Sequence, residues 1–441
     1  MEKYVYETDI LIVGGGLAGL SAAIQARRLA EKHGKELRVT LVERWEKKGY
    51  SVCYGANNAC LNPIALNELF PNWKELNAPL NTPVTEDKFV FLTEKRKISI
   101  PIFKRMPMSN HGNYIAILSD VVMWLVEQAE AAGVEICYNR SAIKVLFHED
   151  GSVKGVQTEY FSDFEIDLSS SVDLIPSCTY RDFHARCTIF ASGSPLDNHL
   201  MEDLSKKFNL SKDCKPQTYC HVSKEVWEIE PSKHRPGVVE HTVGWPLERG
   251  AYGEAYFYHL NEETPQIATG FFMQYNTFYA LEKEFKKIKQ HPGIRPIFEG
   301  GKNISNYYTY ESSLEQGGFQ SIPKLQFPGG CLTGSTASFI TVPQFKGTHH
   351  AMKSGMLAAE SVIEAIIDAE SNTSPTKGLE PKTYTDKVKN SWIYKELKAV
   401  RNMKPSFNSS FGFNGGLFYF GFSMLLGGRE PWTLSHFDSQ K

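Results

Sequence analysis

The sequence has eight cysteines, but no two of them have C-x-x-C spacing. They are Cys53, Cys60, Cys137, Cys178, Cys187, Cys214, Cys220 and Cys331. An iron–sulfur cluster held by thiolates and a structural zinc site both usually need such closely spaced ligands. We therefore expect scattered, reduced core thiols, no iron–sulfur cluster in this chain and no metal site.

Excess positive charge and long apolar runs are also missing. Lys and Arg together number 48 and Asp and Glu 50, which gives a formal net charge of -2 at pH 7. This balance suggests neither a nucleic-acid partner nor electrostatic attachment to anionic lipid. No run of about 18 apolar residues is present, so a membrane-spanning helix is not expected. The N-terminus shows no signal peptide, and whether a transit peptide was removed stays open.

The 441 residues are too many for a single hydrophobic core, so at least two domains are expected. The first recognisable pattern is a βαβ unit. Residues 9–13 and 38–43 are apolar runs typical of buried strands, and residues 20–31 between them are typical of a helix. Such a unit predicts a parallel sheet.

Further elements follow along the chain. Residues 141–148 and 153–158 are expected to form a hairpin with its turn at residues 149–151. Alternating polar and apolar residues from about 218 to 275 indicate an antiparallel sheet in an inserted domain. Other predicted elements are a helix at residues 121–132, a buried strand at 187–191 and a long helix at 348–369.

A glycine-rich turn lies between the first strand and the first helix. Gly14, Gly16 and Gly19 form G-x-G-x-x-G, and Glu43 ends the next strand. Gly14 permits the tight turn, Gly16 lets the backbone approach a pyrophosphate, and Gly19 lets helix and strand pack closely. Glu43 can accept hydrogen bonds from an adenosine ribose. The motif does not distinguish FAD from NAD, and a turn kept only for packing is the alternative; its N-terminal position favours FAD.

Several longer sequence segments resemble those of a known family. They are residues 69–75 (LFPNWKE), 78–87 (APLNTPVTED), 110–114 (NHGNY), 241–247 (HTVGWPL), 258–262 (YHLNE), 317–325 (GGFQSIPKL), 346–349 (KGTH), 351–355 (AMKSG) and 430–434 (EPWTL). Through these strings nearly the whole chain resembles the electron transfer flavoprotein–ubiquinone oxidoreductase family.

The resemblance implies an α/β fold, with a two-dinucleotide-binding, glutathione-reductase-like FAD domain and an inserted antiparallel-sheet domain of the quinone type. Residues 1–217 and 328–370 would form the FAD domain and residues 218–327 the inserted domain. Residues 371–441 would be a C-terminal extension with an apolar, membrane-contacting segment. No catalytic residue is assigned. The residues expected to bind FAD are Gly14, Gly16, Leu17, Ala18, Gly19, Glu43, Arg44, Gly193 and Gly334.

The resemblance also implies a place in the cell and a reaction. Members of the family are monotopic proteins on the matrix side of the mitochondrial inner membrane, and they pass electrons from reduced electron transfer flavoprotein to ubiquinone. They continue into a ferredoxin-like domain with a 4Fe–4S cluster, whereas this chain stops soon after Trp432. The expected partners are electron transfer flavoprotein or respiratory-complex subunits, ubiquinone and the membrane surface.

Several positions depart from the family's pattern, and they are positions that face the ligands in the family. Ile117 stands where the family has an arginine, which would suit a flavin diphosphate. Glu254 stands where the family has the second of two glycines near the quinone. The other departures are in residues 335–338, which lack an expected glycine, and in the loops at residues 49–60, 191–195 and 305–313.

These departures suggest that the family's chemistry has changed in this chain. We hypothesise that electron transfer through FAD to ubiquinone is reduced or lost, and that the chain serves as a membrane-associated subunit of a respiratory complex. The alternative is an active FAD-dependent quinone oxidoreductase whose iron–sulfur domain is a separate chain.

Two further features invite a functional interpretation. Residues 411–426 are the most apolar part of the chain but are too short and glycine-rich for a comfortable span, so we expect shallow membrane insertion or contact with a partner's transmembrane helix. A buried core segment is the alternative. His349 and His350 are adjacent at a helix start, so their side chains are expected to diverge and to serve structure or capping rather than metal binding.

Overall fold

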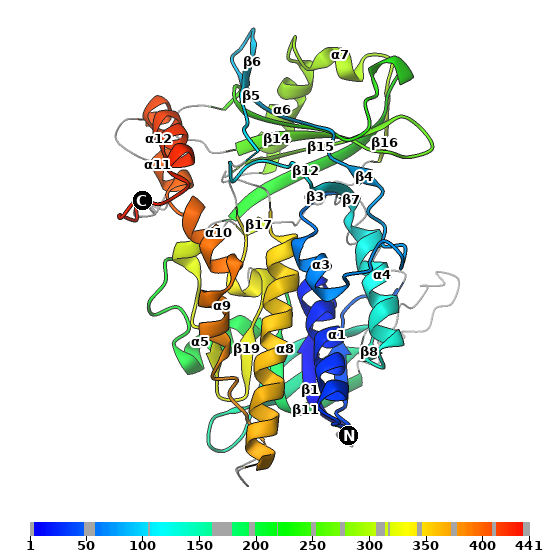
Figure 1. Cartoon of the computed structure of the whole chain (residues 1–441), viewed down its shortest axis with the longest axis vertical. Coiled ribbons are helices and arrows are strands. Elements are labelled where there is room, and N and C mark those ends of the chain that lie inside the picture. Colours follow the sequence, from blue (N-terminus) through cyan, green and yellow to red (C-terminus); the bar gives the residue numbers. More distant parts are fainter. Residues whose placement is uncertain are drawn as a thin grey trace, which may run out of the picture.

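The molecule is built around two large β-sheets, which lie at opposite ends of its long axis (Figure 1). The computed structural model describes residues 4–47, 58–104, 106–160, 179–193, 199–217, 219–247, 253–273, 278–305, 314–315, 318–341, 346–371, 377–407 and 412–434. Within these residues, no helix combines the length and the hydropathy needed to cross a membrane.

The first sheet has the strand order β18-β19-β11-β1-β2-β8. β1 lies at its centre and pairs in parallel with β11 on one side and β2 on the other. Its residues Ile10, Leu11 and Ile12 are fully buried, which explains the continuous apolar run. The strands are β1 (Tyr4–Val13), β2 (Val39–Val42), β8 (Glu135–Cys137), β11 (Thr179–Phe190), β18 (Gln326–Phe327) and β19 (Gly330–Leu332).

A hairpin extends the first sheet from β11. β9 (Arg140–Phe147) and β10 (Val153–Tyr160) are antiparallel, and β10 pairs with β11. Gly151 in the turn has a φ of 85°, a left-handed conformation that glycine adopts without strain. The predicted hairpin is therefore confirmed.

Two long helices pack side by side against the first sheet. They are α1 (Leu17–Lys32) and α8 (Thr348–Ser371), drawn in blue and yellow in Figure 1. A Cβ atom added to Gly355 of α8 would lie only 2.1 Å from the carbonyl oxygen of Ala18, so the two helix backbones approach each other closely there. The other helices of this part are α3 (Ile64–Leu69), α4 (Leu118–Ala131) and α5 (His199–Phe208).

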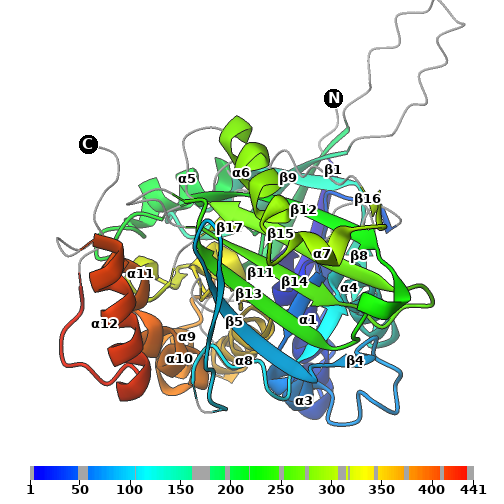
Figure 2. The ribbon, with the colours of Figure 1, turned by 90° about the horizontal axis from the view of Figure 1, so that it is seen from above.

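The second sheet has the strand order β16-β12-β15-β14-β13-β5-β6, with β17 paired to β12 (Figure 2). It is antiparallel as predicted except at one point, where β5 pairs in parallel with β13. β5 and β6 precede the predicted inserted segment in the sequence. The strands are β5 (Glu86–Leu92), β6 (Lys97–Ile100), β12 (Tyr219–Glu228), β13 (Val238–Gly244), β14 (Gly253–His259), β15 (Gln266–Met273), β16 (Lys302–Ser305) and β17 (Leu314–Glu315).

Helices cover the second sheet on the side away from the first. Phe285 of α6 and Phe298 of α7 pack with Phe257 and Phe271 of the sheet in a second hydrophobic core. The helices of this layer are α6 (Phe278–Gln290) and α7 (Arg295–Phe298). A small third sheet has the strands β3 (Asn58–Leu61), β4 (Thr82–Pro83) and β7 (Tyr114–Ile117).

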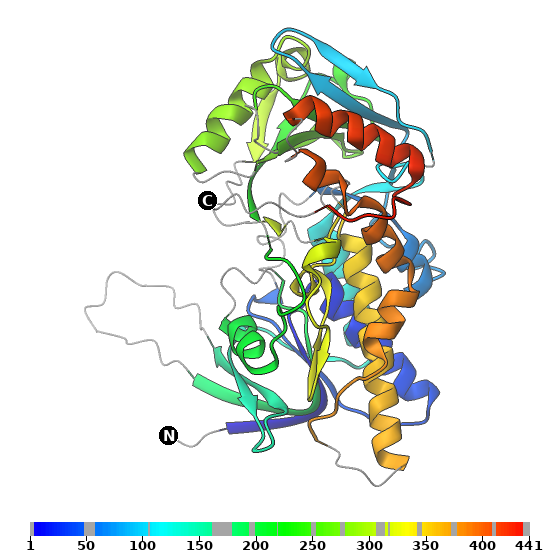
Figure 3. The same ribbon diagram turned by 90° about the vertical axis from the view of Figure 1, so that its left-hand side faces the viewer.

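The C-terminal helices run from the first part of the molecule to the second (Figures 1 and 3). Val400 and Met403, at their middle, form a small core with Phe89 of β5 and Met108. The helices are α9 (Tyr384–Asn390), α10 (Trp392–Val400), α11 (Met403–Phe407) and α12 (Gly412–Leu426). Three 3-10 turns complete the described elements: η3 (Pro231–Lys233), η4 (Phe319–Ser321) and η5 (Gly334–Ala337).

Candidate functional site

Three backbone turns meet at the carboxyl edge of the first sheet. They follow β1 at Gly14, β11 at Ala191 and β19 at Thr333. Each turn is tied to its neighbour, because Gly14 N donates to Val42 O at 2.9 Å, and Ala191 N donates to Val13 O at 2.8 Å. Thr333 N likewise donates to the carbonyl of the last residue of β11 at 3.0 Å. This edge is where open α/β sheets bind their ligands.

The glycine turn leaves no room for a side chain at Gly14 or Gly19. Gly14 has a φ of 104°, and an added Cβ would lie 2.4 Å from Ala191 O. A Cβ on Gly19 would lie 1.9 Å from Gly14 O. Gly16 is the N-cap residue of α1, and no side chain of the described residues caps that helix. The N–H groups of its first turn, including those of Leu17 and Ala18, therefore remain available for a phosphate.

Glu43 follows β2 and is buried beside the glycine turn. Its carboxylate accepts hydrogen bonds from the backbone N–H groups of Gly15 and Trp45. Burial raises the pKa of Glu43, and the two backbone hydrogen bonds partly oppose this shift. Each carboxylate oxygen keeps a further lone pair, which suits the ribose of a dinucleotide. Arg44 is exposed, with its guanidinium 5.2 Å from the ring centre of Trp45.

Two further predicted residues lie at the same edge. Gly193 has a φ of 81°, and its carbonyl accepts a hydrogen bond from Thr336 Oγ1 at 3.0 Å. Gly334 has a φ of 64°, and a Cβ there would lie 2.8 Å from Cβ of Ala18. All the predicted cofactor residues are thus brought to one edge, and their glycine cradle, uncapped helix and buried acid fit an FAD diphosphate and ribose.

The departures from the family's pattern are only partly within the described residues. Ile117 is the half-buried N-cap residue of α4 and offers no cation there. Ser338 has a left-handed backbone with a φ of 65°, a conformation that normally favours glycine. Its hydroxyl donates to Ser321 O at 2.9 Å. The loop departures at residues 49–57, 194–195 and 306–313 lie outside the described residues.

A buried polar cluster lies in the second sheet. Glu254 of β14 and His241 of β13 are only 3% and 5% exposed, and Oε1 of the first lies 3.0 Å from Nδ1 of the second. Tyr258 OH lies 3.4 Å from the other ring nitrogen of His241. Burial raises the pKa of Glu254 well above its usual range and lowers that of His241 to about 3. Burial therefore disfavours the charged form of both groups, and because the His241 imidazole is neutral at pH 7 the contact is not an ion pair.

Lys346 connects this cluster to the start of α8. Its ammonium group is buried and donates to Ser109 O at 2.8 Å. Burial lowers the pKa of Lys346, and the Cys60 and Asp87 side chains oppose that shift. Lys346 in turn helps to lower the pKa of His241. Titratable groups of the second sheet and of the segment that leads into α8 therefore act on one another. No pattern along the sequence would have predicted this.

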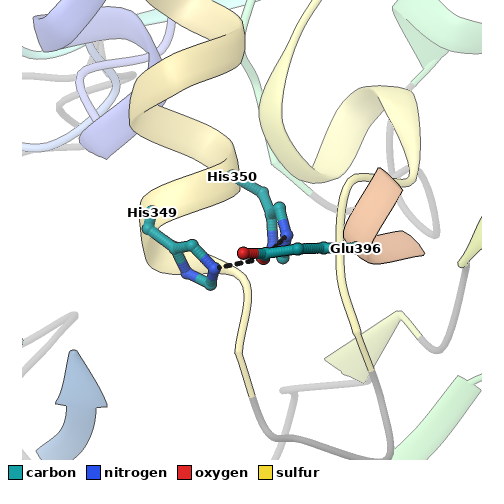
Figure 4. A group of neighbouring side chains, drawn as sticks. All are labelled: His349, His350 and Glu396. Atoms are coloured by element: carbon teal, nitrogen blue, oxygen red, sulfur yellow. Dashed lines mark hydrogen bonds and ion pairs between the residues drawn. The ribbon is translucent and has the colours of Figure 1, made fainter. Parts of the chain in front are cut away.

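The expected divergence of His349 and His350 is wrong. Their ring centres lie 3.9 Å apart, and Nε2 of each ring contacts Oε2 of Glu396 on α10, at 3.0 Å and 2.9 Å (Figure 4). Both rings pack near Trp392. At the first turn of α8 the two side chains can swing to one side, and α10 supplies the acidic partner that the neighbouring sequence lacks.

Two known protein families match the chain, one in each part of the molecule. Residues 9–66 match the family described as "FAD binding domain", and residues 219–309 match the one described as "ETF-QO, ubiquinone-binding". The solved structures that resemble the chain include a geranylgeranyl bacteriochlorophyll reductase-like protein of Thermoplasma acidophilum, with a TM-score of 0.64 at 18% identity, covering 98% of this chain and 93% of that one. Another is a flavoprotein/dehydrogenase of Cytophaga hutchinsonii, with a TM-score of 0.58 at 15% identity, covering 96% and 93%. The predicted α/β fold class is confirmed.

Sequence relatives are much closer. The chain is 48% identical to the mitochondrial electron transfer flavoprotein-ubiquinone oxidoreductase of Sus scrofa, over 99% of its own length and 69% of that protein's. The Caenorhabditis elegans protein of the same name is 46% identical over 99% and 70%, and that of Dictyostelium discoideum 41% identical over 97% and 70%. With nearly its whole length aligned at this identity, the chain belongs to the electron transfer flavoprotein–ubiquinone oxidoreductase family.

Proposed function

We propose that the chain is an FAD-holding protein on the matrix side of the mitochondrial inner membrane, where it serves as a membrane-associated subunit of a respiratory complex. Its electron transfer to ubiquinone is reduced or lost. The observation that carries this proposal is the contrast between two regions. The G-x-G-x-x-G motif of the first sheet (Gly14, Gly16 and Gly19) is intact, whereas a glutamate fills a buried position in the region that matches the ubiquinone-binding family.

The first sheet supports FAD as the cofactor. The uncapped N-terminus of α1 would receive the diphosphate, and Glu43 would hold the ribose. Gly14 and Gly334 keep side chains out of the narrow turns that surround the crevice. When bound, FAD would supply the redox chemistry, and the protein would supply position and electrostatics.

The second sheet supports a weakened quinone site. Glycine lets a ligand approach the backbone closely, and Glu254 replaces glycine at the corresponding family position. Its carboxyl group is buried next to His241, and burial disfavours the charged form of both groups. A quinone ring that approached this strand would have to displace the side chain and leave its polar atoms unpaired, which disfavours binding.

Exposed apolar residues support a membrane-facing surface. Phe418, Phe422 and Leu426 recur every four residues on one face of α12, and Phe418 is 80% exposed. Ile98 of β6 and Phe103 just after it are also exposed. α12 lies beside the β5–β6 hairpin in Figures 1 and 3, so the two groups can contact one lipid surface together. Such a surface suits shallow insertion of aromatic side chains.

Flavin content and quinone reduction test the proposal together. The purified, undenatured protein should show a flavin absorbance spectrum but little reduction of a short-chain ubiquinone by reduced electron transfer flavoprotein. Glu254→Gly should raise that activity. Glu263→Gly, which removes an exposed carboxyl group from the turn between β14 and β15, should leave it unchanged. High activity of the unmodified protein would contradict the proposed loss, and absence of flavin would contradict the cofactor.

The subunit role needs a separate measurement. In gently solubilised mitochondria the chain should migrate with a respiratory complex on native gels, and migration as a free monomer would contradict this role. The intact G-x-G-x-x-G motif also supports the second candidate, an active FAD-dependent quinone oxidoreductase whose iron–sulfur domain is a separate chain. Stoichiometric co-purification with a small cysteine-rich protein that carries an iron–sulfur cluster would favour that candidate.

A further inference from the structure

Three side chains with metal-binding atoms converge where α8 begins and α10 passes it. We propose that His349, His350 and Glu396 bind one divalent transition-metal ion. The two histidines are consecutive residues of the first turn of α8, and Glu396 comes from α10, so the site joins two helices that are distant in the sequence (Figure 4). It is independent of the proposed flavin and quinone functions.

The distances between the ligand atoms suit a small metal ion. Nε2 of His349 and Nε2 of His350 lie 3.0 Å and 2.9 Å from Oε2 of Glu396, and the three ligand atoms all lie within 4.8 Å of one another. Tetrahedral zinc with bonds of about 2.0–2.1 Å separates its ligand atoms by roughly 3.3 Å. The two nitrogen–oxygen distances therefore need to lengthen by only about 0.3–0.4 Å to accommodate the ion.

The two rings are held in place before any ion arrives. Both are buried, with His349 1% and His350 0% exposed. The ring of His349 stacks on Trp392 with an interplanar angle of 8° and a centre separation of 5.4 Å. Within the described residues, Nδ1 of each ring has no hydrogen-bond partner. Among the described residues, the only polar contact of each ring is therefore the one between its Nε2 atom and Glu396.

Metal binding would replace the hydrogen bonds within the cluster. Both Nε2 atoms face the same carboxylate oxygen of Glu396. An ion would bind each neutral imidazole through the lone pair of Nε2, so the proton of each ring would lie on Nδ1, which has no hydrogen-bond partner among the described residues. Neutral imidazole and ionised carboxylate are the forms that bind a metal.

The ligand set points to a class of metal. Two imidazoles and one carboxylate, without a thiolate, suit Zn²⁺, Co²⁺ or Fe²⁺, whereas Ca²⁺ and Mg²⁺ prefer oxygen ligands alone. The side chain of Glu396 is 34% exposed, which gives an ion a route to the buried rings. Three protein ligands leave a fourth position of a tetrahedral ion open, as in sites where the metal also binds water or a small ligand.

Metal titration of the full-length protein tests the site. After chelator treatment, the protein should bind close to one equivalent of Zn²⁺ by calorimetry, and Co²⁺ should give the intense visible bands of a four-coordinate site. Glu396→Gln and His350→Gln should each weaken Zn²⁺ binding by about tenfold or more. His33→Gln, which removes an exposed histidine at the end of α1, should bind as the unmodified protein does.

A second readout guards against misfolded variants. Zn²⁺ should raise the unfolding temperature of the unmodified protein and of His33→Gln, but not that of Glu396→Gln, because only a state with a formed site is stabilised. Near-ultraviolet circular dichroism checks that each variant is folded. If the unmodified protein and folded Glu396→Gln bind Zn²⁺ equally, or if Co²⁺ gives only the weak bands of a hydrated ion, the assignment is overturned.

Discussion

Glu254→Gln should remove a loss of stability that the unmodified protein undergoes as the pH rises above neutrality. Glutamine has nearly the size and shape of protonated glutamate, so it can remain 3.0 Å from Nδ1 of His241 without repacking. It cannot ionise. The change therefore isolates the energetic effect of one buried carboxyl group in the region that matches the ubiquinone-binding family.

The sign follows from the raised pKa of Glu254 in the folded protein. Its stabilising contribution is fully present below the unfolded pKa of about 4.5 and is lost as the pH rises towards the folded pKa. Each pH unit in that interval lowers the free energy of unfolding by about 1.4 kcal/mol. His241 has the opposite sign. Its folded pKa is about 3 and its usual pKa 6.5, so its contribution is lost as the pH falls through that range and is constant above it.

The measurement should therefore be made above about pH 6.5, where His241 no longer contributes to the pH dependence. Other groups that titrate there, such as Lys224 with its pKa lowered to about 8, are the same in both proteins and cancel in the comparison. Between about pH 6.5 and the folded pKa of Glu254, the free energy of unfolding measured with urea should fall more steeply in the unmodified protein than in Glu254→Gln. The difference in slope should be about 1.4 kcal/mol per pH unit. Glu263→Gln, on the exposed turn after β14, should follow the unmodified protein. Parallel curves for the unmodified protein and Glu254→Gln would show that this carboxyl group is not held protonated.

Three other changes test the cradle, the helix contact and the membrane surface. Gly16→Val should abolish flavin retention, measured by absorbance, while the unfolding temperature of the flavin-free protein stays the same, because Gly16 has a φ of -77° that any residue adopts. Gly355→Ala should lower the free energy of unfolding by about 1–3 kcal/mol through overpacking against α1. Gly421→Ala in α12 should not, because an added Cβ there meets no described atom within 4 Å. Phe418→Ser should weaken flotation with phosphatidylcholine–cardiolipin liposomes, and Tyr180→Ser, an exposed aromatic change on β11, should have no effect.

The sequence alone predicted the parts of the structure that depend on residues close together in the chain. The predicted first strand, glycine turn and helix correspond to β1, the turn at Gly14 and α1, because each is specified by local periodicity and by the conformational freedom of glycine. The predicted helices at residues 121–132 and 348–369 correspond to α4 and α8 within a few residues. Burial of Glu43 beside the turn also follows from the fingerprint, because its position after β2 fixes where the side chain lies.

Pairing between distant segments could not be derived in the same way. β5 has three polar residues followed by four apolar ones. Nothing in residues 86–92 specifies a parallel partner in β13, which begins more than a hundred residues later. The close approach of Gly355 to Ala18 also joins distant segments and could not be predicted from the sequence. In a helix rich in small residues one glycine is not distinguishable from its neighbours until the second helix is in place.

The two histidines at the start of α8 show why adjacency in sequence is a poor guide to the geometry of a site. Successive helical residues project about 100° apart from the axis, which argues for divergence if the helix is considered alone. Imidazole is long enough to swing back, however, and burial against Trp392 leaves each ring few other orientations. The carboxylate that unites them is supplied by α10, whose position depends on the packing of the C-terminal helices rather than on any spacing near residue 349. A search for close ligand spacing therefore rejects this cluster, while the fold assembles it from residues that only tertiary packing brings together.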